Sequence, residues 1–138
     1  MGGLMVSNYL SHPAFYPDGK IGVQAAVLSS GSYNLAHYAA PSTPPPSVGT
    51  DGPAALLAQS ALPGMKALTI PVFLTVAEID PPQLVEVAHE LQDQLCMAGH
   101  CPLYTRVKDH GHISEMYSVG TADVSILKSV LDFFRSID

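Results

Sequence analysis

Two residues that follow apolar runs have the side chains that acid–base chemistry needs. Asp80 follows the run from Ile70 to Ala77, and His112 follows the run from Leu103 to Val107. A histidine can take a proton from a hydroxyl group, while a neighbouring carboxylate fixes the ring tautomer and stabilises the charged ring. A carboxylate followed along the chain by a histidine, each after a strand, is the second half of the chain order serine, aspartate, histidine. The pattern predicts a site for acyl-bond hydrolysis, with Asp80 as the carboxylate and His112 as the general base.

A second histidine leaves a metal site open as an alternative. His110 and His112 flank a single glycine, and imidazole is a common metal ligand. With Asp80 as a third ligand, the three side chains would suit a zinc-dependent hydrolase. The His-x-His spacing alone is a weak signal, and the metal-free reading with no cofactor is favoured.

The elements that would position this site alternate between strands and helices. We expect helices over residues 3–10 and 54–61, a strand over 22–29, a strand over 68–77, a helix from Pro82, a strand over 103–107 and a last helix that ends the chain. This order predicts an α/β fold with about three parallel strands flanked by helices and joined by right-handed crossovers. Functional groups of such sheets gather beyond the carboxyl ends of the strands, where the loop of Ser30, Ser32 and Asn34 would also lie.

Two helices have apolar residues at helical spacing. Leu84, Val87, Ala88, Leu91 and Leu95 predict one buried face for the helix that begins at Pro82, with Gly99 after its end. The last helix is expected to bury Leu127, Val130, Leu131 and Phe134, with Thr121 or Asp123 as its N-cap. Asp80 has a structural alternative as the N-cap of the Pro82 helix.

The chain is expected to form a single domain over residues 1–138. Residues 40–53 hold five prolines and two glycines, which cannot sustain a helix or a central strand. Because neither flanking part is long enough to be a complete domain, we expect a surface excursion or lid rather than a linker.

The amino-acid composition argues against several classes of binding partner. The net charge is −6 with only six Lys and Arg residues, which argues against binding to nucleic acid or to anionic membranes. No apolar run reaches about 18 residues, so no membrane-spanning helix is expected. No signal peptide is visible, which makes the cytoplasm the default location. Charged residues are 13% of the chain against roughly 25% in average proteins, so we expect some apolar surface to be covered by more protein.

The two cysteines, Cys96 and Cys101, are five residues apart across an expected helix–strand loop. They would form a disulfide only if their Cα atoms approached within about 7 Å. Two reduced thiols are the favoured expectation.

Three stretches together resemble the C-terminal half of an α/β-hydrolase of the carboxylesterase type. They are Met-Gly-Gly-Leu-Met-Val-Ser-Asn-Tyr-Leu-Ser-His-Pro at the start, Glu-Ile-Asp-Pro-Pro around Asp80, and His-Gly-His-Ile-Ser with the later Ser-Val-Gly-Thr around His112. The resemblance implies a three-layer partial α/β-hydrolase fold, with Asp80 as the acid and His112 as the base. Gly2 and Gly3 would match the glycines after the nucleophile, as a remnant of the oxyanion-binding elbow. The family's serine would stand immediately before Met1, so the chain resembles a truncated hydrolase.

The resemblance also suggests where a replacement nucleophile would lie. In the family, the strand matching residues 22–29 neighbours the nucleophile's strand, so Ser30 and Ser32 are candidates for the missing hydroxyl. An activated serine needs a base within hydrogen-bond reach. The expected substrate is a small uncharged ester.

Association is a further expectation. Three parallel strands would leave an open sheet edge, which is a template for pairing with another chain. We expect a homo-oligomer, most simply a two-fold dimer, with residues 22–29 or the 3–10 helix at its interface. A non-catalytic fold that self-assembles or completes a partner remains an alternative to a hydrolase.

Overall fold

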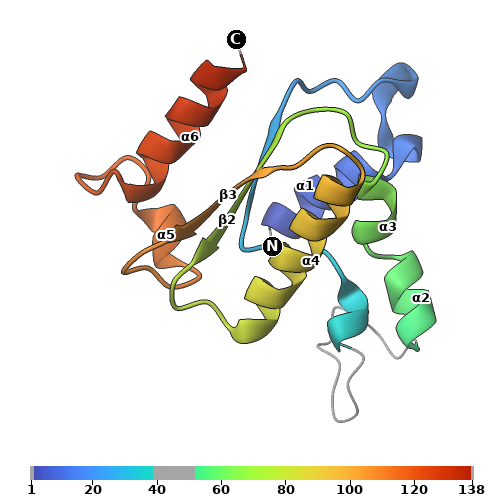
Figure 1. The fold of residues 1–138 in the computed structure, drawn as a ribbon, viewed down its shortest axis with the longest axis horizontal. Helices are drawn as coiled ribbons and strands as arrows, with labels where there is room; N and C mark the ends of the chain where they lie inside the picture. Colours follow the sequence, from blue (N-terminus) through green and yellow to red (C-terminus); the bar gives the residue numbers. More distant parts are fainter. Residues whose placement is uncertain (1, 39–51, 138) are drawn as a thin grey trace.

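The computed structural model describes residues 2–38 and 52–137. One parallel sheet contains the strands β1 (Ala26–Ser29), β2 (Val72–Ala77) and β3 (Leu103–Val107) in the order β1-β2-β3 (Figure 1). Helices flank this sheet, which confirms the expected mixed α/β class with three parallel strands. Of the proline-rich segment, residues 40–51 lie outside the described residues.

Six α-helices and three short 3₁₀ helices occur in the described part of the chain. The α-helices are α1 (Gly2–Ser11), α2 (Pro53–Ala58), α3 (Leu62–Met65), α4 (Pro82–Met97), α5 (Ser114–Tyr117) and α6 (Ser125–Ser136). The 3₁₀ helices are η1 (Pro13–Phe15), η2 (Pro17–Gly19) and η3 (Leu35–Tyr38). None of the described helices combines the length and hydropathy that a bilayer crossing requires.

The main hydrophobic core lies between one face of the sheet and helices α1, α3 and α4. Leu28 of β1 pairs in register with Leu74 of β2, and both side chains are fully buried in this core. The five apolar residues expected on one face of α4 are all buried, which confirms that prediction. Gly64 in α3 allows a close approach to α1, because a Cβ atom there would lie 2.0 Å from the carbonyl oxygen of Ser11.

The opposite face of the sheet packs against α6. The rings of Phe73 in β2 and Phe133 in α6 have centroids 5.5 Å apart, and Ile126 is buried two turns before Phe133. Figure 1 shows α6 and α4 on different sides of the strands.

The face predicted for the last helix is wrong. Leu131 and Phe134 are 43% and 42% exposed, while Ile126 and Phe133 are the buried apolar residues of α6. Apolar residues occupy adjacent positions along this helix, so helical spacing alone fits more than one rotation about the axis. The contact between Phe133 and Phe73 decides which rotation occurs.

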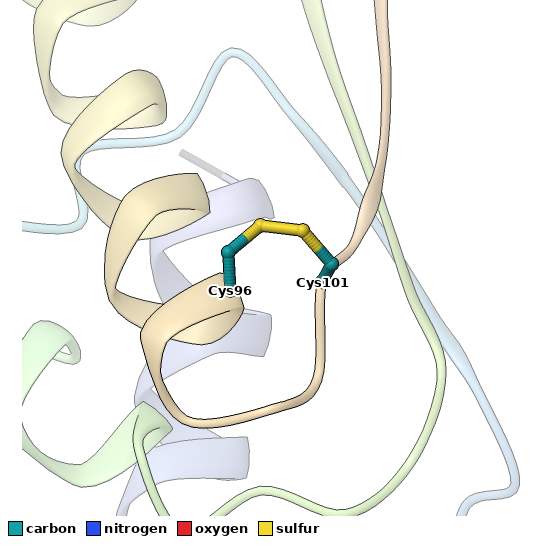
Figure 2. The surroundings of a disulfide bond; sticks show 2 residues. All are labelled: Cys96 and Cys101. Carbon is teal, nitrogen blue, oxygen red and sulfur yellow. A yellow bond between two sulfur atoms is a disulfide. The ribbon is translucent and has the colours of Figure 1, made fainter.

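The end of α4 places the two cysteines together. Gly99 has a left-handed φ of 85°, and the amides of Gly99 and His100 donate to the carbonyls of Cys96 and Leu95. This pattern reverses the chain directly after the helix. Cys101 returns beside the last turn and forms a disulfide with Cys96, so the expectation of two reduced thiols is wrong (Figure 2).

Three expected elements have different limits in the structure. The expected strands over 22–29 and 68–77 are shorter, because the pairing of β1 with β2 begins at Ala26 and Val72. Gly22 has a φ of 68°, which interrupts extended backbone before β1. The helix expected over 54–61 ends earlier, because α2 stops at Ala58 and a separate helix, α3, begins at Leu62.

Candidate functional site

Asp80 and His112 meet at the carboxyl edge of the sheet. Asp80 lies in the turn after β2 and His112 lies in the loop after β3, and Oδ1 of Asp80 is 3.0 Å from Nδ1 of His112. The Asp80 side chain is fully buried, whereas 38% of the His112 side chain is exposed. The expected spatial contact between the two side chains is therefore present, with one ring edge accessible from outside.

Asp80 is fixed by its own turn. Its Oδ2 accepts a hydrogen bond of 2.7 Å from the backbone amide of Ala77. The N-cap position of α4 is occupied by Pro81, and no side chain caps that helix end. The alternative role of Asp80 as the N-cap of α4 is thus wrong, because its carboxylate turns back toward β2.

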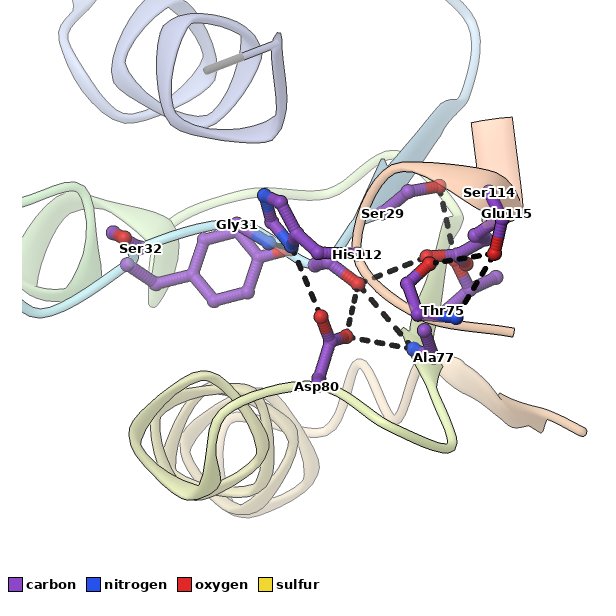
Figure 3. A network of polar contacts seen from close by, with 12 residues as sticks. Ser29, Gly31, Ser32, Thr75, Ala77, Asp80, His112, Ser114 and Glu115 are labelled. Carbon is purple, nitrogen blue, oxygen red and sulfur yellow. Dashed lines mark hydrogen bonds and ion pairs between the residues drawn. The ribbon is translucent and has the colours of Figure 1, made fainter. Parts of the chain in front are cut away.

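A buried polar network continues behind Asp80 (Figure 3). The hydroxyl of Ser30 contacts Oδ2 of Asp80 and also lies 2.9 Å from Oε2 of Glu115. The other carboxyl oxygen of Glu115 is 2.5 Å from Oγ1 of Thr75, which is 2.9 Å from Oγ of Ser29. Glu115 is completely buried, so its carboxyl group depends on these hydroxyl groups for hydrogen bonds.

The backbone of Ser30 is held in an uncommon conformation. Its φ is 45°, in the left-handed region that non-glycine residues rarely adopt, and its amide donates to the carbonyl of Thr75 at 2.8 Å. This conformation directs the Ser30 hydroxyl between the two carboxyl groups. A residue held in this way is typical of functional or ligand-binding positions.

Neither serine expected as a replacement nucleophile is hydrogen-bonded to His112. Ser30 contacts the carboxyl groups of Asp80 and Glu115, and Oγ of Ser32 lies 2.7 Å from the hydroxyl of Tyr38. Activation by His112 would require a direct contact with its ring. Within residues 2–38 and 52–137, the geometry thus gives no support to either serine as the nucleophile.

The ring of Tyr33 packs against Gly31 in the loop that holds Ser30. Its hydroxyl accepts a 3.1 Å hydrogen bond from the amide of Gly31, and the whole side chain is buried. Burial raises the pKa of Tyr33 well above its usual value, and the hydrogen bond from the amide of Gly31 lowers it. The negative charges that Glu115 and Asp80 carry once both are ionised at high pH raise it further. Tyr33 therefore stays protonated at neutral pH.

His110 points to a different part of the molecule from His112. Its Nε2 lies 2.9 Å from Oδ2 of Asp123 and 3.0 Å from Oγ of Ser125, and its Nδ1 lies 3.3 Å from Oγ of Ser114. These contacts tie the loop after β3 to the start of α6. Hydrogen bonds from the amide and the hydroxyl of Ser125, followed by the proximity of His110, lower the pKa of Asp123.

The alternative metal site is not assembled. His110 is held by the start of α6, so it does not converge with His112 and Asp80 on one point. In the described ranges, no group of three His, Cys, Asp or Glu side chains is arranged to hold a metal ion. The N-cap position of α6 is occupied by Val124, so the expectation of Thr121 or Asp123 there is wrong. Oδ1 of Asp123 accepts a 2.9 Å hydrogen bond from the amide of Ser125, the first residue of the helix.

Two hollows meet at His112 and Ser30. The first has a volume of about 370 Å³ and is lined by Gly2 and Gly3 of α1, by the β1 residues Val27 and Ser29, and by Ile113, Met116 and Tyr117 beside the histidine. The second has a volume of about 430 Å³ and is lined by Leu4, Ser32, Tyr38 and the α4 residues around Gln83. Hollows of this size suit small organic ligands.

The start of α1 lies tightly against the end of β1. A Cβ atom on Gly3 would be 2.8 Å from the carbonyl oxygen of Ser29 and 3.0 Å from Cα of Gly31, so only glycine fits there. Gly2 and Gly3 also line the first hollow together with His112.

The second nitrogen of His112 is available for chemistry. Figure 3 shows this ring nitrogen directed away from Asp80, on the side where α1 begins. With Nδ1–H donating to Asp80, the tautomer leaves Nε2 as a proton acceptor. The arrangement can therefore accept a proton from a hydroxyl group or a water molecule placed in either hollow.

Glu115 is the polar residue of this site that sequence reasoning missed. It stands three residues after His112, between the apolar residues Ile113 and Met116, both of which are more than half exposed. A single carboxyl side chain among Ile113, Met116 and Tyr117 is the available signal, but carboxyl side chains usually lie in solvent. Its burial follows only from the position of α5 against Thr75 and Ser30.

Comparison with known proteins adds no family to this geometry. No protein-family model matches the sequence, and no curated protein is detectably similar to it.

Proposed function

We propose that this domain carries the acid–base part of an ester-hydrolysing site of the α/β-hydrolase type. The observation that supports the proposal most directly is the 3.0 Å hydrogen bond between buried Asp80 and half-exposed His112 at the carboxyl edge of a parallel sheet. Supporting it are Gly2 and Gly3, which line the same hollow as His112 and match the glycines that follow the nucleophile in the family.

In this proposal, His112 acts first as a general base and then as a general acid. Its Nε2 takes a proton from a water molecule in the hollow as the water oxygen attacks the ester carbonyl. The imidazolium then protonates the departing alcohol, and the carboxylic acid is the second product. Asp80 stays ionised and stabilises the charged ring.

The position that best suits the reacting ester carbonyl is the amino-terminal end of α1. That end borders the hollow to which Nε2 of His112 is turned, and backbone amides at a helix start stabilise a developing negative charge. The side chains around the hollow include Val27, Met116 and Tyr117. They favour a small uncharged acyl ester over a charged substrate.

Hydrolysis of a short-chain 4-nitrophenyl ester tests the proposal. We expect turnover above the uncatalysed rate for the intact chain and a loss of roughly 10²–10⁴-fold for His112→Ala, because general base catalysis is removed. His100→Ala is the matched control, since His100 is exposed and lies beyond the end of α4. Equal turnover by His112→Ala and the intact chain, or no turnover by the intact chain, would reject this function.

A second candidate function is self-association without catalysis, and we propose a homodimer as its simplest form. Leu131 and Phe134 form an exposed apolar strip on α6, and Met5 and Val6 are exposed on α1. Apolar side chains gathered on one helix face are typical of a surface covered by protein. Robust hydrolysis that depends on His112 would argue against a purely associative role.

A further inference from the structure

A chain of hydrogen bonds lies behind the Asp80–His112 pair, and its far end is a buried carboxyl group. We propose that Glu115 is a positioning residue for His112. The protonated carboxyl group of Glu115 donates a hydrogen bond into this chain, and the chain holds the carboxylate of Asp80 in its orientation toward the His112 ring. The inference rests on the proposed function for its catalytic meaning, but the arrangement of protons follows from the contacts themselves.

The inference depends on how many hydrogens are available between the carboxyl groups of Asp80 and Glu115. The hydroxyl of Ser30 has one proton, and its oxygen lies within hydrogen-bond distance of Oδ2 of Asp80 and of Oε2 of Glu115. An ionised carboxylate can only accept hydrogen bonds. If both carboxyl groups were ionised, one of the two contacts would have no hydrogen, and two like charges would face each other through one oxygen. One carboxyl group must therefore hold a proton.

The surroundings of the two groups indicate which one holds it. Asp80 accepts a hydrogen bond from the amide of Ala77 and faces the Nδ1 edge of His112, and N–H donors bond more strongly to an ionised carboxylate. The described polar partners of the Glu115 carboxyl group are the hydroxyls of Ser30 and Thr75. Burying a charge without a cationic or N–H partner is costly, so the proton belongs on Glu115.

With this proton in place, every hydrogen bond in the chain has a donor. Oε2–H of Glu115 donates to Ser30, whose hydroxyl donates to Oδ2 of Asp80. The hydroxyl of Thr75 donates to Oε1 of Glu115, and Oγ of Ser29 lies 2.9 Å from Oγ1 of Thr75. Oδ2 of Asp80 is then held by two donors, the Ser30 hydroxyl and the Ala77 amide, which leaves Oδ1 directed at His112.

Two substitutions of similar size separate the proton-donating role from packing. Glu115→Gln replaces the neutral acid by an amide that still has one acceptor and a donor, whereas Glu115→Met fills the space without either. The measurements are the ring N–H proton resonance of His112, hydrolysis of a 4-nitrophenyl ester, and the infrared carbonyl band of a neutral carboxylic acid. Glu86→Gln, on the exposed side of α4, is the control.

We expect Glu115→Gln to keep the His112 ring N–H resonance and to keep kcat within roughly threefold, because the orientation of Asp80 is preserved. Glu115→Met should lose or broaden that resonance and lower kcat by roughly 10- to 100-fold at unchanged KM, because Asp80 is no longer held in place. The infrared band should be present in the intact chain and in the Glu86→Gln control, and it should be absent from Glu115→Gln.

Three results would overturn the proposal: equal damage by Gln and Met, no damage by Met, or no neutral-acid band in the intact chain. If Glu115→Met does not fold, Ser30→Gly removes the linking hydroxyl and tolerates the positive φ at that position, and it should reproduce the loss of the His112 resonance. The resonance and the infrared band need no substrate. If the intact chain has no esterase activity, the proposed function is rejected. The His112 resonance and the infrared band still test the role of Glu115 in that case.

Discussion

Helix α4 and helices α5 and α6 cover opposite faces of one sheet, and they distribute their apolar side chains differently. Every apolar residue expected on the inner face of α4 is buried. On the other face, α5 buries Glu115 and exposes Met116, and α6 exposes Leu131 and Phe134. The α4 face is a hydrophobic core, whereas the α5–α6 face combines a polar site with an uncovered apolar strip. Helical periodicity predicts the first arrangement and fails for the second.

The contrast between the two faces of the sheet is tested most directly by replacing one leucine by alanine on each face. Leu91→Ala in α4 should lower the free energy of unfolding by about 2–5 kcal/mol, because a fully buried side chain leaves a cavity in the core. Leu131→Ala in α6 should change it by no more than about 0.5 kcal/mol, because that side chain already meets solvent. Urea denaturation of both variants measures the difference, and comparable losses would mean that the two faces are packed alike.

A smaller effect is expected if the strip on α6 is an interface. The double substitution Leu131→Ser and Phe134→Ser should weaken self-association by at least about tenfold, because it removes apolar area from the contact. Sedimentation equilibrium of the intact chain and the variant measures this. A double substitution at exposed Leu57 in α2 and Met97 in α4 is the control. If the intact chain is a monomer at micromolar concentration, the apolar strip on α6 is not an interface between copies of the chain.

The smallest expected effect concerns acid stability at the start of α6. The pKa of Asp123 is lowered from its usual 3.8, mainly by its hydrogen bonds to Ser125. The folded protein thus holds this carboxylate ionised more readily than the unfolded chain does. The resulting stabilisation is present above the unfolded value and is lost as pH falls through the lower folded value.

Asp123→Asn should therefore show a slightly smaller loss of stability than the intact chain between about pH 5 and pH 2. Urea midpoints at several acidic pH values measure the difference. Asp93→Asn, at an exposed position on α4, serves as the comparison on the other face. A steeper acid loss in Asp123→Asn than in the intact chain would contradict the direction of the shift.

Local sequence patterns predicted the elements in which apolar residues follow a regular spacing or a continuous run. The spacing of apolar residues after Pro82 predicted α4, and Gly99 was correctly expected after its end because its left-handed φ permits the reversal there. The runs before Asp80 and before His112 predicted β2 and β3, and the parallel sheet then brought the two side chains together. Their catalytic roles remain predictions.

Other features could not be predicted because they depend on contacts between distant segments. The disulfide follows from the chain reversal that returns Cys101 to Cys96. The rotation of α6 follows from the packing of Phe133 on Phe73. Neither contact has a periodic signature in the sequence.

Local sequence patterns were enough to predict the alternation of strands and helices, the buried face of α4 and the order in which a carboxylate and a histidine follow two strands. Those features depend on side-chain periodicity and turn chemistry, which act over a few residues. Long-range contacts were needed to show that Glu115 turns inward, that Ser30 lies between two carboxyl groups, and that His110 contacts the start of α6 rather than Asp80. Each of these depends on how three separate segments meet at one edge of the sheet, where burial and hydrogen-bond satisfaction outweigh the local preference of a polar side chain for water.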